Sequence, residues 1–212
     1  MEVLDRMVVD LKTDNRNHHL EVAEKPNRVV AIASSMGGIQ ALITIISALP
    51  SNFSAAILLV QHLSPKHESH LTHILSRYTT LNVQEVREGM SLEQGTIYVT
   101  PPDKHLLVNN DSTLSLSDAP KEHYVRPSAE YTFKSLANSY GYKAIAVVLT
   151  GCDGDGKEGV QQVSKMGGKV IAQNRESAEA FSMPETAIET GCVDLVLPLD
   201  EIADGIMNMV CT

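Results

Sequence analysis

Short apolar runs alternate with amphipathic stretches from Arg28 to the end of the chain. Strands are predicted where β-branched and other apolar residues run together between turn residues, at 29–33, 56–61, 82–86, 144–149, 169–172 and 193–197. Helices are predicted where apolar residues recur every three or four positions, at 38–49, 67–78, 127–139, 156–166, 184–190 and from about 200 onward. This alternation is typical of an α/β fold with a doubly wound, mainly parallel sheet and helices on both faces.

Two regions depart from this alternation. In the middle of the chain, 96–99, 106–108 and 113–117 are short strand candidates, and the turn residues between the last two predict a small antiparallel β-hairpin. At the start, residues 1–27 are polar and mixed in charge. We expect these first residues to form a tail or linker, and 28–212 to form one domain.

Composition narrows the class of protein. With 212 residues and 43% hydrophobic content, the chain has room for one sizeable α/β domain. A net charge of −9 repels phosphate backbones, which argues against nucleic acid as a partner. The three cysteines are too widely spaced for a metal motif or a disulfide framework, as expected in a reducing compartment.

No targeting or membrane segment is evident in the sequence. No apolar run approaches the roughly 18–20 residues that cross a bilayer, and residues 1–12 lack the apolar core of a signal peptide. We therefore expect a cytoplasmic protein that is not inserted in a membrane.

Polar segments follow three of the predicted strands. Ser34-Ser35-Met36-Gly37-Gly38 follows 29–33, Gln61-His62 ends 56–61, and a glycine-rich loop at 151–156 follows 144–149. Because the carboxyl ends of parallel strands share one edge of a sheet, these segments should meet there. A serine, a histidine and an aspartate at one edge are the components of a nucleophile, a base and a group that orients the base.

The serine segment has two interpretations. Ser34 or Ser35 can cap the helix that follows, or one of them can be a nucleophile on a tight turn. Gly37 and Gly38 allow a sharp bend, and the N–H groups that open the helix would stabilise an oxyanion. The pattern is not the Gly-x-Ser-x-Gly elbow of α/β-hydrolases, because position 33 is alanine.

The histidines also leave alternatives open. A lone histidine such as His62 at the end of a buried strand is more often structural than catalytic. His67, His70 and His73 have a spacing that makes a zinc site conceivable. Since no cysteine or clear carboxylate completes that set, we predict no metal site.

The loop 151–156 resembles two known ligand-binding motifs incompletely. It matches a phosphate-binding P-loop except at Glu158, where a serine or threonine should hold magnesium. A calcium loop fits no better, because its twelfth position is Ser164 instead of glutamate. Asp153 and Asp155 would also repel a phosphate. The remaining interpretations of Asp155 are a helix N-cap, a catalytic acid, or both.

Taken together, these segments resemble the catalytic domain of the CheB family, the chemotaxis protein-glutamate methylesterases. The resemblance runs from about Arg28 to about Met207, and its specificity lies in the joint order and spacing of many short matches. The matching segments are Ser35-Met36-Gly37-Gly38, Leu49-Pro50, Val60-Gln61-His62, Gly95-Thr96-Ile97-Tyr98, Pro101, His105-Leu106, Arg126-Pro127-Ser128, Leu149-Thr150-Gly151 through Asp155-Gly156, Ala172-Gln173-Asn174, and Met183-Pro184 with Ala187.

The resemblance implies a role for each part of the site. Ser35 would be the nucleophile, His62 the general base and Asp155 the acid that orients it. Candidates for oxyanion stabilisation or substrate binding are Met36, Gly37, Cys152 and Arg126. The implied enzyme is a carboxylic ester hydrolase that needs no cofactor and no metal.

The resemblance also implies a substrate. The enzyme would remove methyl esters from glutamate side chains of the cytoplasmic helices of methyl-accepting chemotaxis receptors, and it would deamidate selected glutamines. Family members usually carry an N-terminal receiver domain, which residues 1–27 are too short to form, so a separate receiver domain is a candidate partner. The alternatives are a methylesterase-like domain acting outside chemotaxis, a P-loop-like nucleotide binder, and a non-catalytic interaction module.

Two further departures from the family pattern lie in the predicted site. Met36 stands where threonine or alanine is common, and Asp153 adds a charge beside the predicted catalytic centre. We expect Asp153 to raise the pKa of His62.

Overall fold

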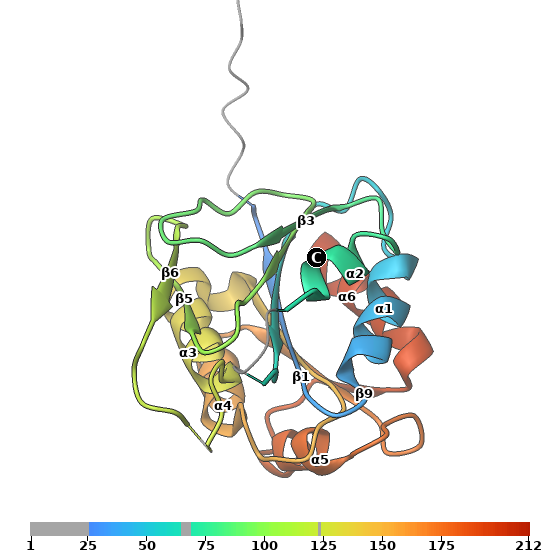
Figure 1. Cartoon of the computed structure of the whole chain (residues 1–212). Coiled ribbons are helices and arrows are strands. Elements are labelled where there is room, and N and C mark those ends of the chain that lie inside the picture. Colours follow the sequence, from blue (N-terminus) through green and yellow to red (C-terminus); the bar gives the residue numbers. More distant parts are fainter. Residues whose placement is uncertain (1–25, 65–68, 123) are drawn as a thin grey trace, which may run out of the picture.

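A seven-stranded parallel sheet forms the centre of the protein (Figure 1). The computed structural model describes residues 26–64, 69–122 and 124–212. Within them the strand order is β3-β4-β2-β1-β7-β8-β9, and every neighbouring pair is parallel. The strands of this sheet are β1 (Val29–Ser34), β2 (Ala56–Gln61), β3 (Asn82–Glu85), β4 (Thr96–Val99), β7 (Ala144–Val148), β8 (Lys169–Gln173) and β9 (Leu195–Leu197).

Helices cover both faces of the sheet (Figure 1). One face packs against α1 (Gly38–Ala48), α2 (Leu71–Leu75) and α6 (Ile202–Cys211), and the other against α3 (Ala129–Tyr140), α4 (Lys157–Lys165) and α5 (Ser182–Glu189). Side chains of β1 alternate between the two cores: Val30 and Ile32 face α1, whereas Ala31 and Ala33 face α3. The predicted doubly wound α/β fold is therefore confirmed.

The predicted hairpin is also present. β5 (His105–Val108) and β6 (Leu114–Ser117) pair in antiparallel register as a separate two-stranded sheet. Leu106 and Leu114 are buried in the same hydrophobic cluster as Phe133 of α3. This packing fixes the start of α3, which matters for the site described below.

Some predicted boundaries were wrong. The helix expected at 67–78 is α2, which ends at Leu75. Beyond it the chain forms tight turns with hydrogen bonds between residues three apart. The Arg77 N–H donates to the Ile74 carbonyl, and the Tyr78 N–H donates to the Leu75 carbonyl. Residues 67 and 68 lie outside the described residues, as do residues 1–25 of the expected tail. The helix expected at 127–139 begins at Ala129.

The remaining elements are short connections. Two 3₁₀ helices, η1 (Gly141–Lys143) and η2 (Leu199–Glu201), precede β7 and α6. Among the described residues, no helix is long and apolar enough to cross a bilayer.

The chain reverses its direction across the sheet between β1 and β7. β2, β3 and β4 are added on one side of β1, and β7, β8 and β9 on the other. The carboxyl ends of the strands at such a switch point form the usual ligand crevice of open α/β sheets. The segments that follow β1, β2 and β7 are the three polar segments singled out in the sequence.

Candidate active site

The serine segment forms a tight turn between β1 and α1. Gly37 adopts the left-handed conformation with φ of 73°, which favours glycine, and α1 begins at the next residue. The backbone of Ser35 is fixed from both neighbouring strands: its N–H donates to the Thr150 carbonyl at 2.9 Å, and its carbonyl accepts from Gln61 Nε2 at 2.9 Å. The turn therefore holds Ser35 at the switch point.

The capping interpretation of the two serines was wrong. Gly37 is the N-cap residue of α1, and no side chain bonds to the first turn of that helix. Ser34 is fully buried and donates instead to Gln61 Oε1 at 2.7 Å. The Ser34 hydroxyl is thus used in a bond between β1 and β2 and does not cap α1.

Gly38 is required by the close packing beneath this turn. Replacing Gly38 with alanine is expected to cost about 1–3 kcal/mol of unfolding free energy, because the new Cβ would lie 2.3 Å from Gln61 Oε1 and 2.7 Å from Ser34 Cβ. Urea unfolding of the variant measures this cost. The matched control is Ser47→Ala at an exposed position of the same helix, for which we expect a change within about 0.5 kcal/mol. A Gly38→Ala protein as stable as the control would contradict the packing described here.

His62 follows β2 and lies between two carboxylates. Its side chain is only 8% exposed. Nε2 lies 2.8 Å from Asp155 Oδ2 in a hydrogen bond. Nδ1 lies 3.2 Å from Asp153 Oδ2, a close ionic contact, yet this buried nitrogen has no aligned hydrogen-bond partner among the described residues.

Asp155 is buried and its carboxylate is held by α3. Oδ1 accepts from the Ser128 hydroxyl at 2.5 Å, and Oδ2 accepts from the Ala129 N–H at 2.6 Å as well as from His62. The N-terminus of a helix stabilises a negative charge at this position. The expectation that Asp155 caps α4, the helix that follows it, was wrong: Gly156 is the N-cap residue there, without a side-chain bond.

The N-terminus of α4 is held in turn by α3. Glu130 is buried and accepts from the N–H groups of Glu158 at 2.9 Å and Gly159 at 2.6 Å. Burial raises the pKa of Glu130, although these bonds oppose the shift. In a P-loop, the amides at this position would bind phosphate. Since a glutamate of this chain already occupies them, the arrangement argues against the nucleotide-binding alternative.

The two carboxylates dominate the electrostatics of His62. Burial on its own would lower the pKa of His62, but the close contacts and negative charges of Asp153 and Asp155 outweigh it and raise that pKa to about 9. The predicted direction of the effect of Asp153 is therefore confirmed. At neutral pH the ring is mainly an imidazolium.

Ser35 lies beside this pair but is not bonded to it. The backbone N–H of His62 donates to the Ser34 carbonyl at 3.0 Å. Ser35 and His62 therefore lie side by side, each just after one of the neighbouring strands β1 and β2. A Cβ on Gly151 would lie 3.0 Å from Ser35 Cβ, which shows how closely the loop 151–156 packs against the serine. Among the described residues, no side-chain hydrogen bond joins Ser35 to His62.

Three of the other predicted residues surround Ser35. Met36 is 54% exposed, and its carbonyl accepts from the Thr150 hydroxyl at 2.8 Å. The Cys152 thiol lies 3.6 Å from the Met36 sulfur, across the edge between β1 and β7. Gly37 supplies the bend between Ser35 and α1. Met36, Gly37 and Cys152 thus flank the serine as the sequence predicts, although their roles remain predictions.

Arg126 has a more structural setting than expected. Its guanidinium donates to Asp103 Oδ1 at 2.8 and 3.0 Å and to the carbonyls of Asp118 and Ala119 at 3.0 Å each. These bonds tie the segment before α3 to the loop before β5 and to the residues that follow β6. Arg126 nevertheless lines a cavity of about 180 Å³ together with His62, so a contact with substrate stays a prediction.

Sequence reasoning missed the residues that support Asp155. His105 is fully buried: its Nε2 donates to the Pro120 carbonyl at 3.1 Å, and its Nδ1 accepts from the Ser128 N–H at 3.2 Å. Burial lowers the pKa of His105, which favours the neutral ring that these bonds require. His105 and Ser128 both belong to segments that match the CheB family, but nothing in their spacing indicates that they position Asp155.

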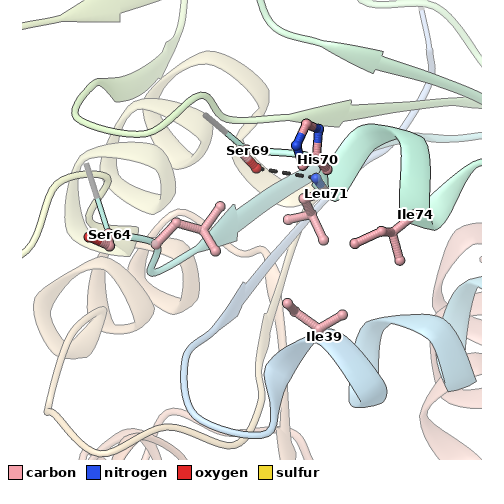
Figure 2. Close-up of a pocket in the computed structure, with 7 residues that line it drawn as sticks. Ile39, Ser64, Ser69, His70, Leu71 and Ile74 are labelled. Atoms are coloured by element: carbon pink, nitrogen blue, oxygen red, sulfur yellow. Dashed lines mark hydrogen bonds between the residues drawn. The ribbon is translucent and has the colours of Figure 1, made fainter. Parts of the chain in front are cut away.

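An apolar cavity of about 310 Å³ adjoins the site (Figure 2). Leu63, the neighbour of His62, lines it together with Ile39 of α1 and Ile74 of α2. Figure 2 shows the two isoleucines pointing toward one another across the cavity. An apolar side chain of a bound partner could therefore be accommodated next to His62.

The described residues offer no metal site. No group of three or more histidine, cysteine, aspartate or glutamate side chains among them is arranged to hold a metal ion, and His67 of the conceivable zinc set lies outside them. Cys152, Cys192 and Cys211 are free thiols.

A buried histidine–aspartate pair beside a serine is the arrangement that serine hydrolases use to activate the serine. Comparison with known proteins gives the family. The family model described as CheB methylesterase matches residues 30–206. The chain therefore belongs to the CheB methylesterase family.

Relatives and a solved structure agree with this assignment. A protein-glutamate methylesterase/protein-glutamine glutaminase 2 of Methanosarcina acetivorans is 37% identical over 94% of this chain and 58% of its own length. A protein-glutamate methylesterase/protein-glutamine glutaminase of Pyrococcus abyssi is 39% identical over 87% of this chain and 51% of its own. The chain thus spans about half the length of these curated relatives. The crystal structure of the Thermotoga maritima CheB methylesterase catalytic domain superposes with a TM-score of 0.83 at 36% identity, covering 86% of this chain and 98% of that one.

Proposed function

We propose that this chain is a serine esterase that hydrolyses methyl esters on glutamate side chains of methyl-accepting chemotaxis receptors, and that it also deamidates selected receptor glutamines. The observation that carries this proposal is the 2.8 Å bond between His62 and the buried Asp155, placed at the switch point beside the Ser35 turn. The relatives, named as protein-glutamate methylesterases/protein-glutamine glutaminases, support the same substrate class.

The reaction follows the acyl-transfer pattern. Ser35 Oγ attacks the ester carbonyl and its proton passes to Nδ1 of His62, the nitrogen that Asp155 leaves available. His62 then gives this proton to the departing methoxide, which leaves as methanol. A water molecule, deprotonated by the same nitrogen, attacks the acyl-enzyme; the bond to Ser35 Oγ breaks, His62 returns the proton to that oxygen, and the free glutamate is released. With a glutamine substrate, ammonia leaves in place of methanol.

Each supporting group has a defined task. Asp155 holds the imidazole in orientation and stabilises its positive charge while the proton is on Nδ1. The backbone N–H groups of Met36 and Cys152, on either side of Ser35, stabilise the developing oxyanion. No step calls for a cofactor.

The surroundings of the site suit a helical protein substrate. The apolar cavity lined by Ile39, Leu63 and Ile74 accepts an apolar side chain on the same helix as the target glutamate. A second cavity, lined by His62, Lys121 and Arg126, favours an acidic neighbour. We place the reaction in the cytoplasm, with a receiver domain on a separate or longer chain as its regulator.

Methanol release from membranes that contain methylated receptors tests this function. We expect the protein to release methanol in proportion to its concentration, and the Ser35→Ala variant to release none above background. Absence of methanol release, with receptors shown to be methylated, would contradict the proposed substrate and favour an ester outside chemotaxis or a non-catalytic role.

A further inference from the structure

His62 makes contact with two carboxylates where the proposed reaction uses one. Asp155 is hydrogen-bonded to Nε2 of the ring, and Asp153 Oδ2 lies 3.2 Å from Nδ1. Nδ1 is the nitrogen that must accept the proton of Ser35. The imidazole therefore has a carboxylate on the side where the nucleophile belongs.

We propose that Asp153 is a positioning residue that holds His62 in a resting state, and that it must leave Nδ1 before Ser35 can transfer its proton. This inference rests on the proposed function and deepens it. In the resting state the ring carries a proton on each nitrogen and points one toward each acid. In the working state Asp153 has moved away, Nδ1 has lost its proton, and the Ser35 hydroxyl donates to Nδ1.

The two acids differ in how firmly they are held. The Asp155 side chain is fully buried and receives bonds from Ser128 and Ala129 as well as from His62. The Asp153 side chain is 28% exposed and lies on a loop beside Gly154. Its Oδ1 accepts from the Asp155 N–H at 3.4 Å, and its contact with Nδ1 lacks the alignment of a hydrogen bond. Because the Asp153 carboxylate reaches solvent and the Asp155 carboxylate does not, Asp153 is the acid that can move away from the ring.

Other charged groups near the ring do not replace these two contacts. Lys121, Tyr124 and Arg126 line the neighbouring cavity, and Arg126 is itself paired with Asp103. His70 lines the apolar cavity on the Leu63 side. Glu179 packs against the serine turn, since a Cβ on Gly37 would touch it. His105 lies on the Asp155 side of the ring and accepts from the Ser128 N–H. The direct ionic contacts with His62 among the described residues are those with Asp153 and Asp155.

The consequence is an alkaline activity profile. Each unit by which the pKa of His62 exceeds the working pH lowers the fraction of neutral base about tenfold. Removing the charge of Asp153 should lower that pKa, because its contribution raises it. A variant that lacks the Asp153 charge should therefore acylate Ser35 faster at neutral pH and reach the same limiting acylation rate at high pH.

The first test is the pH dependence of Ser35 acylation by a fluorophosphonate probe, which requires no receptor. We compare the wild type with Asp153→Asn, which removes the charge but keeps a polar side chain, and with Asp153→Ala, which also clears Nδ1. Asp204→Asn, at an exposed position of α6, is the matched control. We expect both Asp153 variants to shift the midpoint down by at least about one pH unit and to react at least about tenfold faster at pH 7, with alanine equal to or faster than asparagine.

The second test is NMR titration of the His62 ring in the same four proteins, which needs no catalysis. We expect the ring to titrate at lower pH in both Asp153 variants and unchanged in Asp204→Asn. An unchanged titration in folded Asp153 variants overturns this role of Asp153, as does a slower acylation rate at pH 7. A wild type that is never acylated but whose ring titration still shifts in the variants contradicts the proposed function alone.

Discussion

Replacing Ser35 with alanine is expected to lower methyl ester hydrolysis by about 10⁴-fold or more, to the background rate. The reaction needs an oxygen nucleophile at this turn, and alanine supplies none. The fold should be unaffected, because the turn is held by the backbone of Ser35 and not by its hydroxyl. We therefore expect an unfolding free energy within about 0.5 kcal/mol of wild type. Methanol release and thermal unfolding measure the two quantities.

Ser34→Ala is the matched control for this variant. Ser34 is buried and bonded to Gln61, so its loss should cost about 1 kcal/mol of stability and leave most of the ester hydrolysis intact. Hydrolysis retained by Ser35→Ala would show that Ser35 is not the nucleophile. Hydrolysis lost in a folded Ser34→Ala variant and retained in Ser35→Ala would assign the reaction to the neighbouring serine.

Replacing Asp155 with asparagine should affect both catalysis and stability. The amide cannot stabilise the imidazolium and favours the wrong tautomer of His62, so we expect a loss on the order of 10⁴-fold in kcat, as in the Ser-His-Asp template. The amide N–H₂ would also face the donors Ser128 and Ala129, which now bond to a carboxylate. This mismatch should cost roughly 3 kcal/mol of unfolding free energy.

Stopped assays at saturating substrate and urea unfolding of the same preparation separate the two effects. Asp204→Asn serves as a control for charge removal and should match the wild type in both. A folded Asp155→Asn variant with a normal kcat would show that the bond between His62 and Asp155 has no part in the reaction.

Much of this arrangement follows from the sequence. The apolar runs at 29–33, 56–61 and 144–149 are β-branched and bounded by turn residues, which predicts buried parallel strands, and they lie next to one another as β1, β2 and β7. Because parallel strands end at one edge, the meeting of His62 and Asp155 there could be expected from the chain alone.

Other features depend on contacts between distant elements and could not be predicted. The carboxylate of Asp155 bonds to α3, not to the helix next to it in sequence, because the β5–β6 hairpin packs Phe133 and its helix against the sheet. Glu130 is the reciprocal case, because this residue of α3 bonds to the first turn of α4. Helix 67–78 was predicted too long because periodicity does not distinguish a helix from consecutive tight turns.

The most direct measurement of the central claim is the site of modification by a fluorophosphonate probe, mapped by mass spectrometry in wild type and in His62→Gln. The account predicts one stoichiometric adduct on Ser35 in the wild type at alkaline pH, and at least about a hundredfold slower labelling of the same residue in the folded variant. An adduct on another residue, or labelling of Ser35 that proceeds equally fast without the imidazole, would contradict it.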